Sequence, residues 1–483
     1  MPYQDNAMRV RREVLIRLAE CLLEDTPEKA DRIPLEMRPR RGGPTRCCVH
    51  KDRAVIKYRC MAGLGHGVEE ETDELVPISE YARRAMHRRR PSDPILTVID
   101  EACSACLKSQ HVVTDACRGC MARPCTMNCP KDAIRVEGGR ARIDPDACVN
   151  CGKCVGVCPY HAIVRVPIPC EEACPVGAIA KDEAGKETID YQACISCGKC
   201  MRACPFGAIM EKSQMADVLR VLKSDRPTVA MLAPAVVGQF PGTLGQVAEA
   251  LARLGFDHVM EVATGADETA VREAAELVER LDRGDELMTT SCCPAFVQAV
   301  KRHLPELAEA VSHTPSPMVL GARWARKTMP EAATVFVGPC VAKRVEAIES
   351  DEVDYVMTFE ELGAVLVAAG IDVAECDEAK LANPARREGR AFPVSGGVSA
   401  GVAALATGAD VKPVLVDGLS EKALKLLKVY AAGKCPGNFV EVMACEGGCV
   451  AGPACLGDPR RAGRDIEKLT TETPSLTDRD EAG

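Results

Sequence analysis

Aromatic residues are scarce in this chain, although hydrophobic residues in general are not. Phe, Trp and Tyr together make up 3% of the 483 residues, with a single Trp, while the hydrophobic share reaches 47%. That share permits full burial of several cores, and a chain of this length predicts two or three domains.

The first 25 residues lack the apolar run of an export signal. Apolar residues recur at helical spacing between Val10 and Leu23, with charged residues between them, which predicts an amphipathic surface helix and not a membrane span. Arg11-Arg12 could open a twin-arginine signal, but Glu13 and Arg17 interrupt the segment that follows. We therefore expect a cytoplasmic protein without membrane contact.

Nucleotide-binding loops are also absent. Neither GxxxxGK nor GxGxxG occurs between a strand and a helix, and Gly396-Gly397 predicts only a loop hinge or a helix start. The eight histidines show no paired ligand spacing. These absences argue against a bound flavin or nicotinamide.

The formal net charge of -9 argues against nucleic acid as a partner. Basic runs do occur locally, and they are most simply solvated loops. Docking of an acidic electron carrier is the minority alternative for these runs, which comprise Arg38, Arg40, Arg41 and Arg88 to Arg90.

Cysteine, by contrast, is abundant, with 28 residues. A disulfide framework suits short secreted chains, so metal sites are the better explanation here. Cys47, Cys48 and Cys60 match no ligand spacing, and we expect them to be structural or solvent-shielding thiols.

Two stretches reproduce the bacterial ferredoxin spacing residue for residue. In such a run three closely spaced thiolates hold one corner of a cubane and the fourth ligates a neighbouring cluster. The runs are Cys148-x2-Cys151-x2-Cys154-x3-Cys158-Pro159 and Cys194-x2-Cys197-x2-Cys200-x3-Cys204-Pro205. We predict [4Fe-4S] clusters that transfer electrons.

An internal repeat surrounds these runs. Pro124-Cys125-x3-Cys129-Pro130 is answered by Pro169-Cys170-x3-Cys174-Pro175, and each leads through an Ile-Asp step into one full run. The chain has therefore duplicated a ferredoxin-like unit. Cys103-x2-Cys106 and Cys117-x2-Cys120 alone would pass for a zinc ribbon, but a Cys-Pro pair follows, which is typical of a ferredoxin run.

Ligand counting predicts three or four accessory clusters. Cys170 and Cys204 are left two ligands short of a fourth cluster, which Cys103 and Cys106 could complete. In the alternative that remains open, Cys158 and Cys204 are exchanged between the two full runs, so that each ligates a cluster of the other run. The favoured sets are Cys148, Cys151, Cys154 and Cys129; Cys117, Cys120, Cys125 and Cys158; and Cys194, Cys197, Cys200 and Cys174.

Three short motifs follow in the C-terminal half: TSCCP ending at Pro294, PCVAK ending at Lys343, and EVMACEGGC ending at Cys449. Strands alternate with helices around them, which predicts a parallel sheet. Reactive residues gather at the carboxyl ends of parallel strands, so we expect the motif thiols to converge at the edge of a single sheet. Four unrelated core cysteines are the alternative.

In this order the motifs resemble the three signature segments of the [FeFe]-hydrogenase active-site domain. The resemblance implies a cubane that is bridged by its last ligand to a two-iron centre with CO, cyanide and dithiolate ligands. It also implies dedicated maturation proteins. The four ligands it implies are Cys293, Cys340, Cys445 and Cys449.

The resemblance also implies a proton relay. Glu273 and Glu276 lie three residues apart on one helix face, with Arg280 beyond them, and Ser312 follows in the chain. Cys292, beside the ligand Cys293, would pass protons between the dithiolate amine and these carboxylates. A solvated helix face would look similar, and a small buried filler is the alternative for Cys292.

Further positions match the family's diiron pocket. Lys343 corresponds to the lysine that donates to an iron-bound cyanide, with Glu346 near it, and a solvated loop lysine is the alternative. Ala233, Pro234 and Met443 correspond to residues that line the pocket. The departures are Gly338 for a usual Met, Phe296 for Trp and Met318 for Gln, which predict a cavity and fewer donors and indicate a divergent branch.

We therefore predict an α/β active-site domain preceded by a duplicated α+β ferredoxin-like domain. The expected function is reversible H2 oxidation, with electrons passing to or from ferredoxin; the alternative is a non-catalytic or slow hydrogen sensor or an iron-sulfur assembly protein. The expected regions are a helical or irregular segment at 1–100, the ferredoxin-like domain at 101–214, the catalytic domain at 215–462 and a polar tail at 463–483.

Overall fold

The computed structural model describes residues 5–43, 46–88, 93–103, 106, 110–381 and 384–478. Arg89, Arg90 and the last five residues of the expected tail lie outside the described residues. Among the helices of the described ranges, none combines the length and apolar character needed to cross a bilayer.

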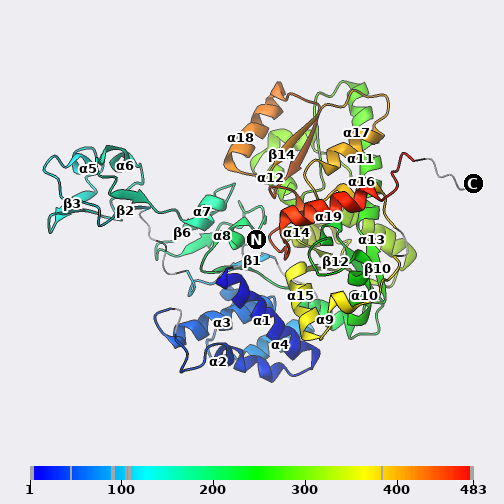
Figure 1. Cartoon of the computed structure of the whole chain (residues 1–483), viewed down its shortest axis with the longest axis horizontal. Helices are drawn as coiled ribbons and strands as arrows, with labels where there is room; N and C mark the ends of the chain where they lie inside the picture. Colours follow the sequence, from blue (N-terminus) through cyan, green and yellow to red (C-terminus); the bar gives the residue numbers. More distant parts are fainter. Residues whose placement is uncertain are drawn as a thin grey trace, which may run out of the picture.

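The N-terminal region is a group of helices packed against the C-terminal domain (blue in Figure 1). Asp5 caps the first helix, because its Oδ1 accepts a hydrogen bond from Met8 N at 2.8 Å. The apolar face of this helix, including Val14 and Leu18, is fully buried, which confirms the predicted amphipathic helix. The helices are α1 (Asn6–Leu23), α2 (Ile33–Met37), α3 (Val49–Gly63) and α4 (Ile78–His87), and α1 contacts α15 (Phe359–Ala368).

Arg88 does not lie in a solvated loop, contrary to the expectation for that basic run. Its Nε donates to Asp217 Oδ1 at 2.9 Å, and its Nη1 donates to the carbonyl oxygens of Leu64 and Gly65 at 3.1 and 2.9 Å. Asp217, on α9 (Met215–Leu222), is completely buried, and a buried carboxylate requires a cationic partner.

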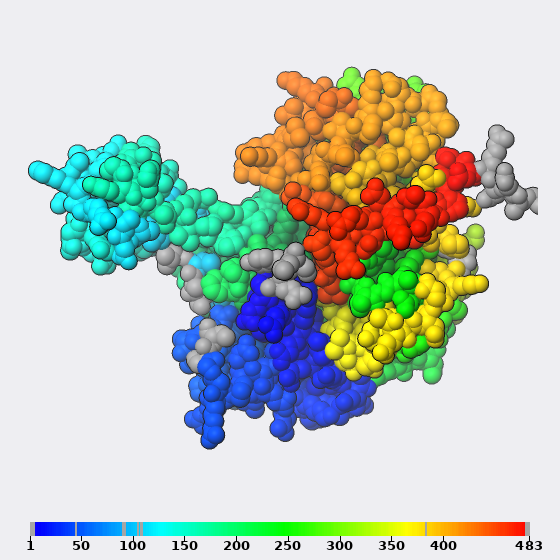
Figure 2. Space-filling model, viewed as in Figure 1, coloured from blue at the N-terminus to red at the C-terminus, as the bar shows by residue number. Residues whose placement is uncertain are grey.

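Two ferredoxin-like units follow, as the repeat predicted. The outer unit, residues 110–166, projects from the molecule (cyan in Figures 1 and 2), and it is inserted into the inner unit, residues 96–103, 106 and 167–211. The outer unit contains β2 (His111–Val113), α5 (Pro124–Met127), β3 (Ile134–Glu137), β4 (Arg140–Ile143), α6 (Lys153–Val157) and β5 (Ile163–Arg165). The inner unit contains β1 (Leu96–Val98), α7 (Pro169–Ala173), β6 (Ile179–Lys181), β7 (Glu187–Ile189), α8 (Lys199–Ala203) and β8 (Ile209–Glu211).

The two units repeat the same antiparallel pairings. β2 pairs with β5 and β3 with β4, while β1 pairs with β8 and β6 with β7. Thr114 N donates to Ala162 O at 2.8 Å, and Ile99 N donates to Ala208 O at 2.6 Å at the equivalent place. β1, which precedes the inserted outer unit in the chain, therefore pairs with β8 and completes the inner unit.

The C-terminal domain, which follows the ferredoxin-like units, contains two parallel sheets, where a single sheet was expected. One has the order β10-β9-β12-β13 and the other β11-β15-β14. They bury their apolar strands in different cores, one shared with the N-terminal helices. The strands are β9 (Thr228–Leu232), β10 (His258–Glu261), β11 (Met288–Thr289), β12 (Ala333–Gly338), β13 (Tyr355–Thr358), β14 (Pro413–Asp417) and β15 (Phe439–Met443).

Helices cover both sheets (Figure 1). The expected boundary at residue 463 falls inside α19, whose Ala462 and Ile466 are buried, so a packed helix rather than a free tail extends past it. The helices are α10 (Leu244–Leu254), α11 (Ala263–Arg283), α12 (Pro294–His303), α13 (Pro317–Thr328), α14 (Lys343–Ser350), α16 (Arg387–Ala391), α17 (Gly397–Leu405), α18 (Glu421–Val429) and α19 (Pro459–Thr471).

Candidate active site and cluster sites

The motif cysteines line one cavity of about 90 Å³. Cys293 follows β11 and caps α12, Cys340 follows β12, and Cys445 follows β15. Cys449 begins a short 3-10 helix beyond Cys445, and Cys292 shares the same wall. The predicted convergence is therefore present, although the carboxyl ends of two sheets supply it.

These thiols crowd one another in a buried place. Burial raises the pKa of Cys445, and the neighbouring thiols of Cys340, Cys449 and Cys293 raise it further. Burial also raises the pKa of Cys340 to about 11. Thiolates are formed in such a place only beside strong positive charge, and metal coordination supplies it.

A cluster suits the thiols better than a single ion. Within the described ranges, no three His, Cys, Asp or Glu side chains form a site for one metal ion. A cubane instead spreads its thiolate ligands over its corners. The four motif cysteines could hold such a group.

The rest of the cavity wall is apolar, as the resemblance implied. Ala233, Pro234 and Met443 all line it, together with Met318. Buried Phe296 packs in the neighbouring core. Sequence reasoning did not identify Phe392 and Pro393, which complete the wall and lie in no motif.

Lys343 is the cation on the cavity wall. Its Nζ donates to Glu346 Oε2 at 2.6 Å, to Ser316 Oγ at 3.0 Å and to Cys292 O at 3.4 Å. Burial opposes the charge, but Glu346 outweighs it and the pKa of Lys343 is raised. With its side chain 10% exposed, this is a buried charged donor and not a solvated loop lysine.

The space beside Gly338 is filled, which corrects the cavity expected from the missing Met. A Cβ added to Gly338 would lie 2.5 Å from Phe336 Cε1 and 3.2 Å from Ala233 Cβ. The Phe336 ring lines the active-site cavity itself. A bulky aromatic two residues earlier on β12 therefore occupies the volume.

Glu273 lies beneath the first motif and is fully buried, so it does not belong to a solvated helix face. Its Oε1 accepts hydrogen bonds from Ser291 N at 3.2 Å and Ser291 Oγ at 3.3 Å, while its Oε2 has no partner. Burial raises the pKa of Glu273 to about 8. This carboxyl therefore holds a proton at neutral pH. Ser291 was not identified from the sequence, although it stands inside the TSCCP motif.

Glu276 continues the line of groups toward solvent. Ser312 Oγ donates to Glu276 Oε2 at 2.7 Å, and His313 N donates to Glu276 Oε1 at 3.0 Å. Arg280 Nη2 donates to Glu276 Oε1 at 2.7 Å, and hydrogen bonds of this kind lower the pKa of Glu276 despite its burial. The side chain of His313 is 78% exposed, so the line ends at the surface.

Glu441 is a buried carboxylate whose position the sequence reasoning left unexplained. Its Oε1 accepts from Gly396 N at 2.8 Å and its Oε2 from Ser399 N at 2.7 Å. Both donors lie at the start of α17, where Gly396 has φ 93°, a conformation that favours glycine. Gly396 is thus a helix start, one of the two predicted alternatives.

The accessory cysteines fall into groups, and in each group a buried thiol has its pKa raised by the thiols near it. Cys200 is affected by Cys197, Cys194 and Cys174; Cys154 by Cys148, Cys151 and Cys129; Cys125 by Cys120 and Cys158; Cys106 by Cys103 and Cys204; and Cys170 by Cys204 and Cys106. In each case burial is the first cause of the raised pKa.

The four accessory thiols that directly precede a proline share one local geometry. Each accepts a hydrogen bond from the backbone N of the alanine four residues later, at 3.2 to 3.4 Å. A thiolate that accepts a backbone N–H is held in a fixed direction. The thiols are those of Cys129, Cys158, Cys174 and Cys204.

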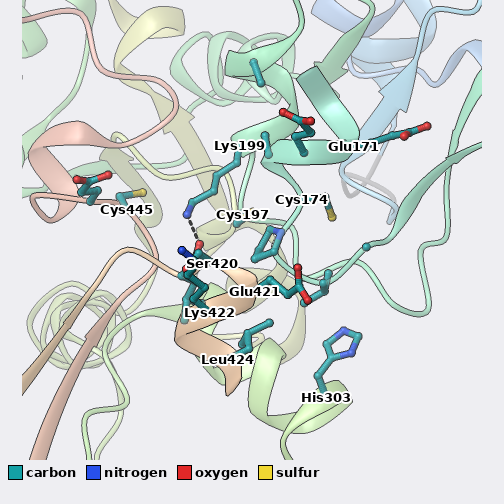
Figure 3. Close-up of a pocket in the computed structure, with 18 of the residues that line it drawn as sticks. Glu171, Cys174, Cys197, Lys199, His303, Ser420, Glu421, Lys422, Leu424 and Cys445 are labelled. Atoms are coloured by element: carbon teal, nitrogen blue, oxygen red, sulfur yellow. Dashed lines mark hydrogen bonds between the residues drawn. The ribbon is translucent and has the colours of Figure 1, made fainter. Parts of the chain in front are cut away.

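The inner unit reaches the active-site cavity. Cys197 lines that cavity and contributes to the raised pKa of Cys445. Both also line a larger groove of about 1550 Å³, together with Cys174 (Figure 3). Lys199 Nζ donates to Leu419 O across this groove. No sequence signal indicated this approach.

Of the remaining cysteines, Cys455 lies next to the motif cysteines, because its Sγ donates to Cys449 O at 3.5 Å. Cys60 is completely buried in the main core, which supports its structural interpretation. Cys47 Sγ and Cys48 Sγ are 3.9 Å apart. Cys376 and Cys455 are buried, and Cys435 is partly buried.

Known proteins share both halves of this arrangement. The family model described as "Iron only hydrogenase large subunit, C-terminal domain" matches residues 226–453. The model described as "4Fe-4S binding domain" matches residues 141–164 and 187–210.

Individual relatives are hydrogenases. The chain is 30% identical over 402 residues to Iron hydrogenase 1 of Clostridium pasteurianum, covering 70% of this chain and 69% of that protein. It is 29% identical over 394 residues to the NADP-reducing hydrogenase subunit HndD of Solidesulfovibrio fructosivorans, covering 68% of this chain and 58% of that protein.

Among solved structures, one [FeFe]-hydrogenase studied for oxygen inactivation overlaps with a TM-score of 0.47 at 25% identity, covering 55% of this chain and 91% of that one. HydA1 of Chlamydomonas reinhardtii overlaps with a TM-score of 0.43 at 25% identity, covering 51% and 85%. On the identity and coverage shared with the clostridial enzyme, the chain belongs to the [FeFe]-hydrogenase, or iron-only hydrogenase, family.

Proposed function

We propose that this protein is an [FeFe]-hydrogenase that interconverts H2 with two protons and two electrons and exchanges electrons with ferredoxin. The observation that carries the proposal is the shared cavity of Cys292, Cys293, Cys340, Cys445 and Cys449, with Lys343 on its wall. The line from Glu273 to His313 adds a route for protons.

The residues fit a cubane with an attached diiron unit. Cys293, Cys340 and Cys445 would hold the cubane, Cys449 would link it to the diiron unit, and the apolar wall would exclude water. The buried Lys343 ammonium suits a cyanide nitrogen as acceptor. When bound, the diiron unit supplies the low-valent iron at which H2 is split or formed.

The chain's own groups move the proton. Cys292 Sγ exchanges it with Glu273, which is protonated near neutral pH and whose Oε2 has no hydrogen-bond partner. Ser312 Oγ passes it to Glu276 Oε2, and His313 is the exit to solvent. Arg280 keeps Glu276 in place and charged.

Electrons travel along the two ferredoxin-like units. Cys197 lies beside Cys445, so the cluster that Cys197 would help to hold would be the last before the active-site cubane. Iron-sulfur clusters can have the low potentials that suit the H2 couple. The four accessory sites take their ligands as follows: Cys194, Cys197, Cys200 and Cys174; Cys103, Cys106, Cys170 and Cys204; Cys117, Cys120, Cys125 and Cys158; Cys148, Cys151, Cys154 and Cys129.

The proposal includes a reducing cytoplasm and separate maturation proteins that deliver the diiron unit. All 28 cysteines are unpaired in the structure, which suits thiolate ligands. A slow hydrogen-sensing role is the second candidate, because Met318 on the cavity wall replaces the glutamine donor of the family. An assembly protein without the diiron unit is the third.

Turnover tests the proposal. Protein with reconstituted clusters and the diiron cofactor should evolve H2 from a reduced viologen and from reduced ferredoxin. Slow turnover would favour the sensor. No turnover in protein with a full complement of iron would overturn the enzymatic assignment.

A further inference from the structure

A second cavity, of about 560 Å³, lies where the N-terminal helices meet the inner unit. It is lined by residues of α1, of α3 and the segment before it, and of the stretch from Arg202 to Phe206. It does not share a wall with the active-site cavity. Its volume is in the range of sites for small molecules.

The cavity is rich in cations. Those on its wall are Arg38, Arg46, Lys51, Arg59 and Arg202, whereas the carboxylates are Asp5 and Asp52. Two of the cations are partly neutralised, because Arg46 Nε lies 3.7 Å from Asp52 Oδ1 and Lys51 Nζ lies 3.6 Å from Glu101 Oε2. Positive charge still exceeds negative charge on the wall of this cavity.

Among these cations, Arg59 gives the strongest indication that an anion binds in the cavity. Its side chain is 5% exposed, and its Nη2 donates only to carbonyl oxygens, those of Phe206 at 2.9 Å and Gly207 at 3.3 Å. Its Nε is buried without a partner. Burial, followed by the charges of Arg46 and Arg38, lowers the pKa of Arg59 to about 10. A buried guanidinium among like charges is costly unless an anion faces it.

Arg38 repeats the pattern. Its Nε is also buried without a partner, and across the described ranges neither Arg38 nor Arg59 has a carboxylate at ion-pair distance. The thiol of Cys204 accounts for part of the surroundings of Arg59, because it favours the charged form. It does not account for Arg38 on the same wall.

We infer that this cavity binds a phosphate-bearing small molecule, with its phosphates on the arginines. A guanidinium group can donate two parallel hydrogen bonds to two oxygens of one phosphate. Val10, Val55, Ile56 and Phe206 also line the cavity, and these apolar side chains suit an organic group such as a base. Inorganic polyphosphate and a nucleotide both carry the phosphate groups that the arginines would bind, and the test below distinguishes between these two ligands.

The test is calorimetric titration of the full chain, with its clusters loaded, against inorganic pyrophosphate, ADP and adenosine. Pyrophosphate and ADP should bind, increasingly weakly as salt is raised, and adenosine should not. Tighter binding of ADP identifies a nucleotide as the ligand, and tighter binding of pyrophosphate identifies an inorganic one.

A variant with Arg38→Ala and Arg46→Ala should bind both anions about tenfold more weakly or worse, since hydrogen bonds to charged groups are removed. Arg32→Ala, on a well-exposed residue of the same region, is the matched control and should change nothing. If the double variant does not fold, Lys51→Gln should still lower the salt dependence. Absence of anion binding to the unmodified chain, or equal binding by a folded variant, would overturn the inference.

Discussion

The aromatic ring of Phe336 covers the backbone of Gly338 on β12. A Cβ added at Gly338 would lie 2.5 Å from Phe336 Cε1 and 2.7 Å from Cζ. The two residues are therefore matched in volume at the wall of the active-site cavity, and neither can be changed independently.

Gly338→Ala should consequently destabilise the catalytic domain by about 1–3 kcal/mol, the usual cost of overpacking a core. Phe336→Leu in the same chain should recover most of the loss, because the smaller side chain vacates the space. Thermal unfolding measures both effects. Gly321→Ala is the control, since its added Cβ would be 3.6 Å from Met260 Cε, and it should not destabilise. Equal destabilisation by both alanines would contradict the account.

Glu273→Gln should lower H2 evolution by about a hundredfold or more, the usual contribution of a positioned proton-transfer group. The amide keeps the shape and the Ser291 contact but does not carry protons. Glu279→Gln, on the exposed side of the same helix, should be nearly as active as the unmodified protein. Iron content must be equal in all three. An active Glu273→Gln protein would remove Glu273 from the relay.

The free energy of unfolding should depend on pH through the carboxyl group of Glu273. The pKa of Glu273 is raised from 4.5 to about 8 by burial, so between these values the folded chain keeps a proton that the unfolded chain releases. Its contribution to stability is therefore complete below pH 4.5 and is lost as pH rises toward about 8. Unfolding temperatures measured across this window should fall less steeply for Glu273→Gln. If the unfolding temperatures of the unmodified protein and of Glu273→Gln fell equally with pH, Glu273 would have an ordinary pKa.

Replacing both Cys103 and Cys106 by alanine should remove one cubane, that is about four irons per chain. The reason is that these thiols stand with Cys170 and Cys204 in one group. Iron and sulfide analysis, with paramagnetic resonance of the reduced protein, measures the loss. The pair Cys47→Ala and Cys48→Ala should retain all iron. Unchanged iron in the first variant would leave three accessory clusters.

The convergence of the motif cysteines could be predicted because each lies in a short motif after a strand. Cys293, Cys340 and Cys445 each follow a recognisable strand, and strand ends converge in α/β folds. Their division between two sheets could not be predicted, since β11 is two residues long and a short apolar run does not specify its neighbour.

Contacts between segments that lie far apart in the sequence could not be predicted either. The repeat revealed two ferredoxin-like units, but the insertion of one into the other depends on the pairing of β1 with β8, which leaves no local signature. The approach of Cys197 to Cys445 depends on how two domains pack. Arg88 looked like part of a solvated run because its partner Asp217 is far away in the chain.

The most direct test of the central claim is the infrared spectrum of protein matured with the diiron cofactor. If Cys293, Cys340, Cys445 and Cys449 hold the cluster, stretching bands of iron-bound CO and cyanide should appear, should vanish in Cys449→Ser and should persist in Cys435→Ser. Absence of these bands in unmodified protein with its full cubane iron, or their survival in Cys449→Ser, would contradict the account.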